Sequence, residues 1–188
     1  MLFSVRLFLD NPATRTYIKV SFKGKKAMEI MMKIGALAVD PVSKMPVLIL
    51  KDTQSDQILP IWIGLYEANA IAITLEGIAT PRPMTHDLLK NFLDQTDIKV
   101  DKIVINDVRD NTYYAVIYCH QHDLSYLIDS RPSDAIALAL RTNSPIYVEE
   151  EVIKLSRTPE PGQGTEESER LKRLLESLKP EDFGKYKM

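Results

Sequence analysis

The chain has 188 residues, 45% of them hydrophobic and 27% charged, which is typical of a soluble protein with one sizeable core. Its formal net charge of −2 excludes a global basic field for attracting nucleic acid, so such contact would need a local patch or a metal. The single cysteine, Cys119, excludes an intramolecular disulfide framework and favours a cytoplasmic location. No apolar run approaches the roughly 18 residues of a membrane helix.

Residues 1–27 precede the first regular pattern and are predicted to be an N-terminal extension. Residues 23–25 read Lys-Gly-Lys, which AAA-GGA-AAG can encode, and that string resembles a ribosome-binding site just ahead of Met28. We therefore expect translation to start at Met28, so that the extension is a mis-assigned start. The alternative is a genuine extra strand over residues 16–22.

Residues 28–155 are predicted to form one domain of strands and helices. The strands are runs rich in branched residues, and turn residues such as Asp110-Asn111 separate them. They are predicted over residues 29–40, 46–51, 57–63, 98–107, 112–119, 124–129 and 145–148. Helices are predicted over residues 65–76, ending at Gly77, over residues 87–93, capped by Thr85, and from Pro132 to about Thr142.

Two stretches of this domain match at an offset of 65 residues. The identical pairs are Ile63/Ile128, Ala70/Ala135, Ile71/Ile136, Ala72/Ala137 and Leu75/Leu140. Strand-like runs upstream keep the same register, which indicates a duplicated β-β-β-α unit. The alternative is that any two strand–helix junctions share alanine and isoleucine. We predict an α+β fold, in which a twisted mixed or antiparallel sheet from two such halves carries packed helices.

Residues 156–188 are predicted to be a flexible linker followed by a C-terminal amphipathic helix. Residues 156–164 contain two prolines and two glycines. The helix, over residues 165–178, carries a stripe of leucines at helical spacing: Leu171, Leu174, Leu175 and Leu178. Such a stripe needs a surface to cover, either on its own domain or in a homo-oligomer.

The polar corner at residues 129–134 is a candidate site. Asp129, Arg131, Ser133 and Asp134 gather where a strand delivers the chain to the start of a helix that begins with Pro132. Such a place suits an anion or a metal–phosphate pair. The alternative is a capping cluster in which Arg131 pairs with one of the aspartates.

Two further stretches carry groups suited to phosphate chemistry. On the stiff segment at residues 81–87, His86 can transfer a proton, Asp87 can hold a metal and Arg82 can bind phosphate. At the end of a strand, Asp107 and Asp110 can coordinate a hard cation beside Arg109. Helix capping and hairpin chemistry explain the same residues structurally.

Other signals are weaker. His120 and His122 share one face of a strand but have no third ligand close in sequence, which is more typical of surface histidines. The sequence contains no Gly-rich phosphate loop, HExxH, paired CxxC or GxSxG motif. These absences argue against a P-loop NTPase, a zincin and an α/β-hydrolase.

The strings LPIWIG at residues 59–64, PRPMTHDL at residues 81–88, DVRD at residues 107–110 and DSRPSDAIA at residues 129–137 occur together. Together they resemble the bifunctional nuclease domain family, over roughly residues 28–152. Met84 is the one departure, because the family commonly has another aliphatic residue there. The resemblance implies an α+β domain and a nuclease that acts on RNA and DNA.

We therefore expect a nuclease that hydrolyses phosphodiester bonds of RNA, DNA or both, with a divalent cation (Mg²⁺ or Mn²⁺) and nucleic acid as its partner. The expected catalytic residues are His86, Asp87 and Arg82, the substrate-binding residues Arg109, Arg131 and Ser133, and the metal ligands Asp107, Asp110, Asp129 and Asp134. The alternatives are a non-catalytic anion- or ligand-binding regulatory module and an oligomeric interaction scaffold.

Overall fold

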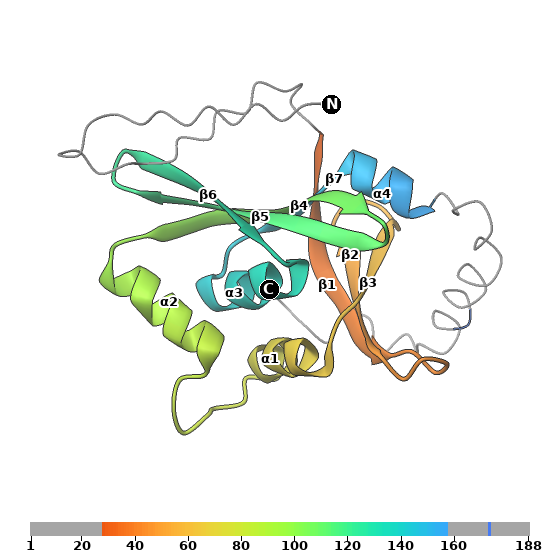
Figure 1. Ribbon diagram of the computed structural model, residues 1–188, viewed down its shortest axis with the longest axis horizontal. Helices are drawn as coiled ribbons and strands as arrows, with labels where there is room; N and C mark the ends of the chain where they lie inside the picture. Colours follow the sequence, from red (N-terminus) through yellow and green to blue (C-terminus); the bar gives the residue numbers. More distant parts are fainter. Residues whose placement is uncertain (1–27, 158–172, 174–188) are drawn as a thin grey trace.

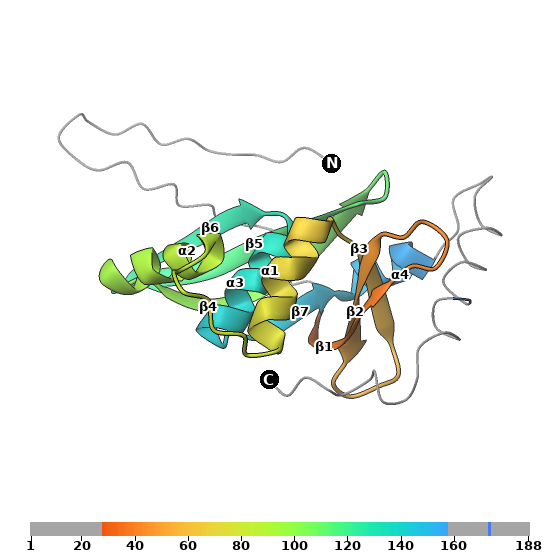
Figure 2. The ribbon, with the colours of Figure 1, turned by 90° about the horizontal axis from the view of Figure 1, so that it is seen from below.

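The computed structural model describes residues 28–157 and residue 173. In this part of the chain, a seven-stranded sheet carries α1, α2 and α3 on one side, and α4 lies at the opposite end of the molecule from α2 (Figure 1). The view from below shows α1 alongside α3, the two helices nearest the middle of the sheet (Figure 2). The strands are β1 Glu29–Val39, β2 Pro46–Asp52, β3 Ile58–Trp62, β4 Lys99–Arg109, β5 Thr112–Gln121, β6 Leu124–Ser130 and β7 Ile146–Glu149. The helices are α1 Leu65–Leu75, α2 Thr85–Gln95, α3 Pro132–Thr142 and α4 Glu150–Arg157.

The strand order across the sheet is β3-β2-β1-β7-β4-β5-β6. Neighbouring strands are antiparallel, apart from the parallel pair β4 and β7. This mixed sheet with packed helices confirms the predicted α+β class. The order β-β-β-α occurs twice along the chain, once on each side of β7. Superposition of the two halves stays a prediction.

Helix α3 lies at the centre of the core. Pro132 begins the helix, where its missing N–H is not needed, and Asn143 ends it in a left-handed conformation with φ 53°. Five consecutive residues of α3, from Ala135 to Ala139, are no more than 2% exposed. The alanines lack bulk, so α1 and the sheet can both approach closely.

Overpacking this helix should cost stability. Ala135 is fully buried, so Ala135→Leu is expected to lower the free energy of unfolding by about 1–3 kcal/mol. The urea midpoint measures the change, and Ala79→Leu, at an exposed loop position, is the matched control. If Ala135→Leu leaves the urea midpoint unchanged, the face of α3 around Ala135 is not tightly packed.

The start of α2 differs from the prediction. The helix begins at Thr85 rather than Asp87, and Met84, not Thr85, is its N-cap residue. The Met84 N–H donates to the Asp87 carboxylate at 2.9 Å. Asp87 therefore caps this helix from inside its first turn, an option that also satisfies a free N–H group.

Helix α4 follows β7 directly and was not predicted from the sequence. Val152 and Ile153 on this helix are buried, at 1% and 2% exposed. The helix continues two residues beyond Leu155, the predicted end of the domain. The predicted extension over residues 1–27 and nearly all of the predicted tail lie outside the described residues. Within the described ranges, no helix is long and apolar enough to cross a membrane.

Candidate functional site

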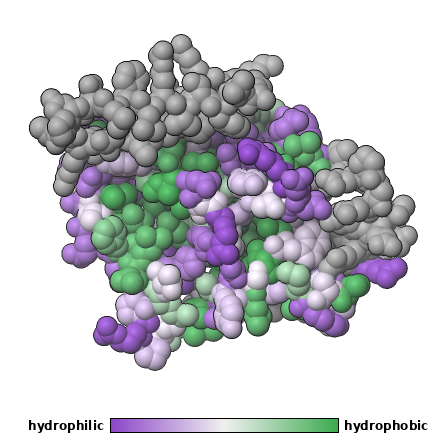
Figure 3. Space-filling view, viewed as in Figure 1, coloured by the Kyte–Doolittle hydropathy of each residue, from purple (hydrophilic) through white to green (hydrophobic). Residues whose placement is uncertain are grey.

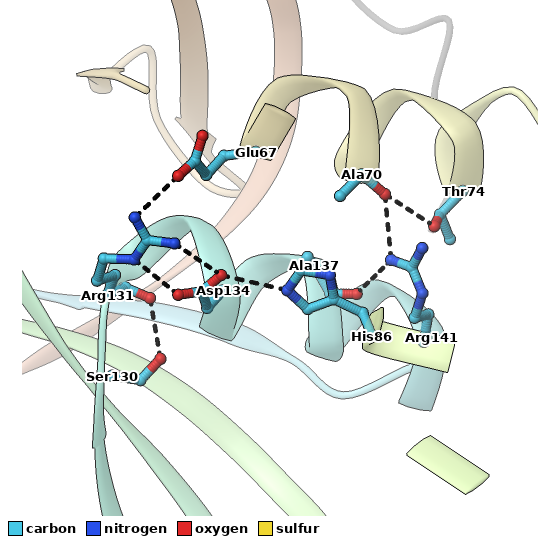
Figure 4. A network of polar contacts seen from close by, with 9 residues as sticks. All are labelled: Glu67, Ala70, Thr74, His86, Ser130, Arg131, Asp134, Ala137 and Arg141. Carbon is cyan, nitrogen blue, oxygen red and sulfur yellow. Dashed lines mark hydrogen bonds and ion pairs between the residues drawn. The ribbon is translucent and has the colours of Figure 1, made fainter. Parts of the chain in front are cut away.

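The strand-to-helix corner between β6 and α3 brings a histidine and a carboxylate together (Figure 4). Asp134 lies in the first turn of α3, and His86 lies in the first turn of α2. His86 Nε2 is 3.2 Å from Asp134 Oδ1, although the two residues are 48 positions apart in sequence. Packing of α2 against α3 therefore creates this pair.

Arg131 forms the third part of this cluster. Its Nε donates to Asp134 Oδ2 at 2.8 Å, and its Nη1 donates to Glu67 Oε1 on α1, also at 2.8 Å. The Arg131 side chain is nevertheless 65% exposed. A guanidinium has five N–H donors, so this one can hold both carboxylates and still present donors to a ligand.

The ionisation of Asp134 determines what His86 can do. Burial raises the pKa of Asp134, but the hydrogen bonds from Arg131 and His86 outweigh burial and lower it below its usual value. Asp134 is therefore a carboxylate near neutral pH and only accepts hydrogen bonds. His86 Nε2 must then donate to it, which leaves Nδ1 of the neutral ring as a proton acceptor.

A buried arginine, Arg141, links the three helices next to this corner. The Arg141 side chain is only 4% exposed, and its Nε donates to Asp87 Oδ1 at 2.5 Å. Its Nη1 donates to the carbonyl oxygens of Ala70, at 3.2 Å, and Ala137, at 2.9 Å. Arg141 therefore ties the start of α2, where His86 lies, to both α1 and α3. Figure 4 shows its bonds to α1 and α3.

Arg141 was not predicted as a site residue, although the sequence carries a signal for it. Arg141 lies seven residues after Asp134, which is two helical turns, so both side chains lie on one face of α3. A charged residue on a helix as apolar as this one indicates a buried partner.

Acid should weaken the Asp87–Arg141 contact. The hydrogen bond from Arg141, and after it that from the Met84 N–H, lowers the pKa of Asp87. A lowered pKa stabilises the fold above the unfolded-state pKa, and this stability is lost as pH falls through the folded-state pKa. We therefore expect the unfolding free energy of the wild type to fall more below about pH 4 than that of Asp87→Asn.

Urea titrations at pH 7 and pH 3 measure this difference. Asp94→Asn is the matched control, because Asp94 forms an exposed i,i+4 pair with Lys90 on the same helix. If Asp87→Asn and Asp94→Asn show the same pH dependence as the wild type, the Asp87–Arg141 pair contributes nothing to acid sensitivity.

The other three predicted metal ligands do not form a metal-binding group with Asp134. Asp107 lies on β4 and pairs with Arg109, which also lies over the ring of Tyr114 at 5.0 Å. Asp107 is opposite Tyr114, the neighbour of core residue Ala115, so it lies on the sheet face away from α3. Across the described residues, no group of three or more His, Cys, Asp or Glu side chains is arranged to hold a metal.

The remaining candidates are distributed as follows. Asp110 and Asn111 form the β4–β5 turn with positive φ values of 47° and 55°, a conformation that aspartate and asparagine tolerate well. Asp129 is exposed on β6, and Ser133 is buried at the start of α3. Arg82 is exposed on the loop before α2, four residues from His86.

The described fold and corner define an α+β domain with a histidine–carboxylate–arginine cluster. A family model for the bifunctional nuclease domain matches residues 48–161. The chain belongs to the bifunctional nuclease domain family, as its motifs predicted.

The chain is also similar to individual proteins, two of them named bifunctional nucleases. Two uncharacterised proteins from strains of Mycobacterium tuberculosis are 35% identical over 161 residues, which is 81% of this chain and 96% of theirs. Bifunctional nuclease 1 of Oryza sativa subsp. japonica is 28% identical over 97 residues, which is 50% of this chain and 29% of the rice protein. Bifunctional nuclease 2 of the same rice is 27% identical over 107 residues, or 55% and 33% respectively.

Proposed function

We propose that this protein is a nuclease that hydrolyses phosphodiester bonds of RNA, DNA or both, at the corner between β6 and α3. The observation that carries the proposal is the contact of His86 and Arg131 with the same carboxylate, Asp134. A proton acceptor and a phosphate-binding cation are thereby held side by side. The family and the rice relatives named bifunctional nucleases support the reaction class.

The residues divide the chemistry between them. Asp134 holds the imidazole, and Nδ1 of His86 takes a proton from the attacking hydroxyl or water as its oxygen bonds to phosphorus. The bond from phosphorus to the leaving oxygen breaks, and that oxygen takes a proton from water. Arg131 contacts the phosphoryl oxygens and stabilises the charge that develops on them. Glu67 and Asp134 keep the guanidinium in place between α1 and α3.

We propose separately that the reaction uses a divalent cation, Mg²⁺ or Mn²⁺. The described side chains do not form a group of three metal ligands, and Asp134, Glu67 and Asp87 are already paired with arginines. We therefore assign no step to a metal. Comparing cleavage in EDTA with cleavage after addition of Mg²⁺ or Mn²⁺ tests the requirement directly.

The proposed partner is nucleic acid and the proposed location is the cytoplasm. The cytoplasmic location is supported by the single cysteine, Cys119, which is a buried free thiol.

Removing the guanidinium tests the proposed phosphate contact. We expect Arg131→Ala to lower cleavage of single-stranded RNA and DNA by roughly 10²–10³-fold, the usual effect of removing one donor to a developing oxyanion. The matched control is Lys154→Ala, which removes an exposed cation that pairs with Glu150 on α4. Equal activity of the two variants would remove Arg131 from the proposed site.

The rival function is a non-catalytic module that binds an anion at the same corner. It makes a different prediction for the wild type: nucleic acid or phosphate binds and Arg131→Ala weakens binding, but no phosphodiester bond is cut. Fluorescence anisotropy of a labelled oligonucleotide, followed by gel analysis of the same sample, separates the two functions.

A further inference from the structure

The two edges of the sheet differ in how they are protected. Strand β3, at one edge, has five residues and contains Pro60, which has no N–H to offer. Strand β6, at the other edge, has seven residues, contains neither proline nor lysine, and pairs with β5 without a bulge. No strand in the described part of the chain pairs with the outer edge of β6. A long, regular edge without proline or lysine is a template for another strand.

An apolar surface adjoins this open edge. The space-filling view shows a broad hydrophobic area where Figure 1 places β6 above α2 (Figure 3). The end of α2 is held near the start of β6, because Gln121, opposite Leu124, donates to the Thr96 carbonyl at 2.7 Å. The large exposed side chains on these two elements are Leu124 at 40%, Ile128 at 46%, Leu88 at 63%, Leu89 at 41% and Phe92 at 62%. Contiguous exposed apolar patches on soluble proteins commonly mark interaction sites.

We propose that a second copy of this chain covers this face, with β6 pairing antiparallel to β6 of the other copy across a two-fold axis. A two-fold interface must be self-complementary, since each patch meets its own image. The segment from β6 to the start of α3 satisfies this condition when the axis passes at Leu127. All seven residues of β6 are then paired, because Leu127 is the middle of Leu124–Ser130.

Charge pairing favours this register over a shift of the axis to Tyr126. With the axis at Leu127, Tyr126 lies opposite Ile128, and Asp123 just before the strand lies opposite Arg131 just after it. A shift of the axis to Tyr126 would instead place Asp123 opposite Asp129 twice, and like charges directly opposite are destabilising. The favoured register also brings the second copy's Asp123 towards Arg131. The interface therefore adjoins the corner that carries the proposed nuclease site.

Sedimentation of the full chain tests the assembly. The wild type is expected at twice the 21.4 kDa chain mass, and Leu124→Lys and Phe92→Glu are expected at the mass of one chain. The matched controls are Val42→Lys and Ile78→Glu, at residues that are 60% and 56% exposed away from this face. Both controls should remain dimers. A monomeric wild type, or a dimer that both patch variants retain, would overturn the proposal and indicate another occupant for the face.

Cross-linking tests the register without disturbing the apolar patch. In a Cys119→Ala background, Leu127→Cys places two thiols opposite each other at the axis, with Cβ atoms roughly 4.5–5.5 Å apart, near the reach of a disulfide. Ser125→Cys is the control, because its opposite residue is Asp129 and the two thiols would be roughly 13 Å apart. Mild oxidation should cross-link Leu127→Cys and leave Ser125→Cys monomeric on a denaturing gel. Cross-linking of Ser125→Cys alone, or of neither variant, would contradict this pairing.

Discussion

Arg141→Ala is expected to lower the free energy of unfolding by about 2–4 kcal/mol, below the usual effect of breaking a fully buried ion pair because the Asp87 side chain is 32% exposed. The change leaves Asp87 without its cation and removes donors from two carbonyl oxygens, of Ala70 and Ala137. It also opens a void among three helices. Urea unfolding at pH 7, followed by far-UV circular dichroism, measures the loss.

Two controls isolate the origin of this loss. Lys154→Ala removes an exposed cation and should change stability by less than about 0.5 kcal/mol. Asp87→Ala combined with Arg141→Ala should cost less than the sum of the two single changes, because the residues are in direct contact. Additive losses would mean that packing, and not the ion pair, accounts for the role of Arg141.

His86→Ala is expected to lower nuclease activity by roughly 10²–10⁴-fold, the contribution that a positioned general acid or base usually makes. The side chain is 16% exposed, so the proposed proton acceptor is sheltered yet reachable. His120→Ala is a close control, because His120 also contacts an aspartate, Asp101, at 2.7 Å. That pair is more exposed, at 42% and 47%, and belongs to β4 and β5 rather than to the α3 corner.

Much of the fold could be predicted from local chemistry. Branched residues marked the strands, Pro132 marked the start of α3, and Asp110-Asn111 marked a hairpin that the structure confirms. Helix α4 was missed because it follows β7 without a turn residue between them, so no local signal separates it from the strand. The Thr85 cap was wrong because the helix begins at Thr85 itself, so Met84 takes the N-cap position and Asp87 accepts from the Met84 N–H group.

The site could be predicted only in part. The polar segment at residues 81–87 and the polar corner at residues 129–134 were both predicted as candidate sites, and the structure places His86 3.2 Å from Asp134. Sequence could not show that Asp107 lies on the other face of the sheet, because a bulge between Ile105 and Asp107 breaks the alternation of side chains. Arg141 was missed because its partner, Asp87, is 54 residues away.

Cleavage of one labelled single-stranded RNA and one labelled single-stranded DNA is the most direct measurement of the proposed function. Wild type, His86→Ala and His120→Ala should be purified in parallel, so that a contaminating nuclease would be present in all three. We expect the wild type and His120→Ala to cut at similar rates and His86→Ala to be at least about 10²-fold slower. Equal rates for all three proteins, or no cleavage by any of them with or without Mg²⁺, would contradict a nuclease site at the corner of β6 and α3.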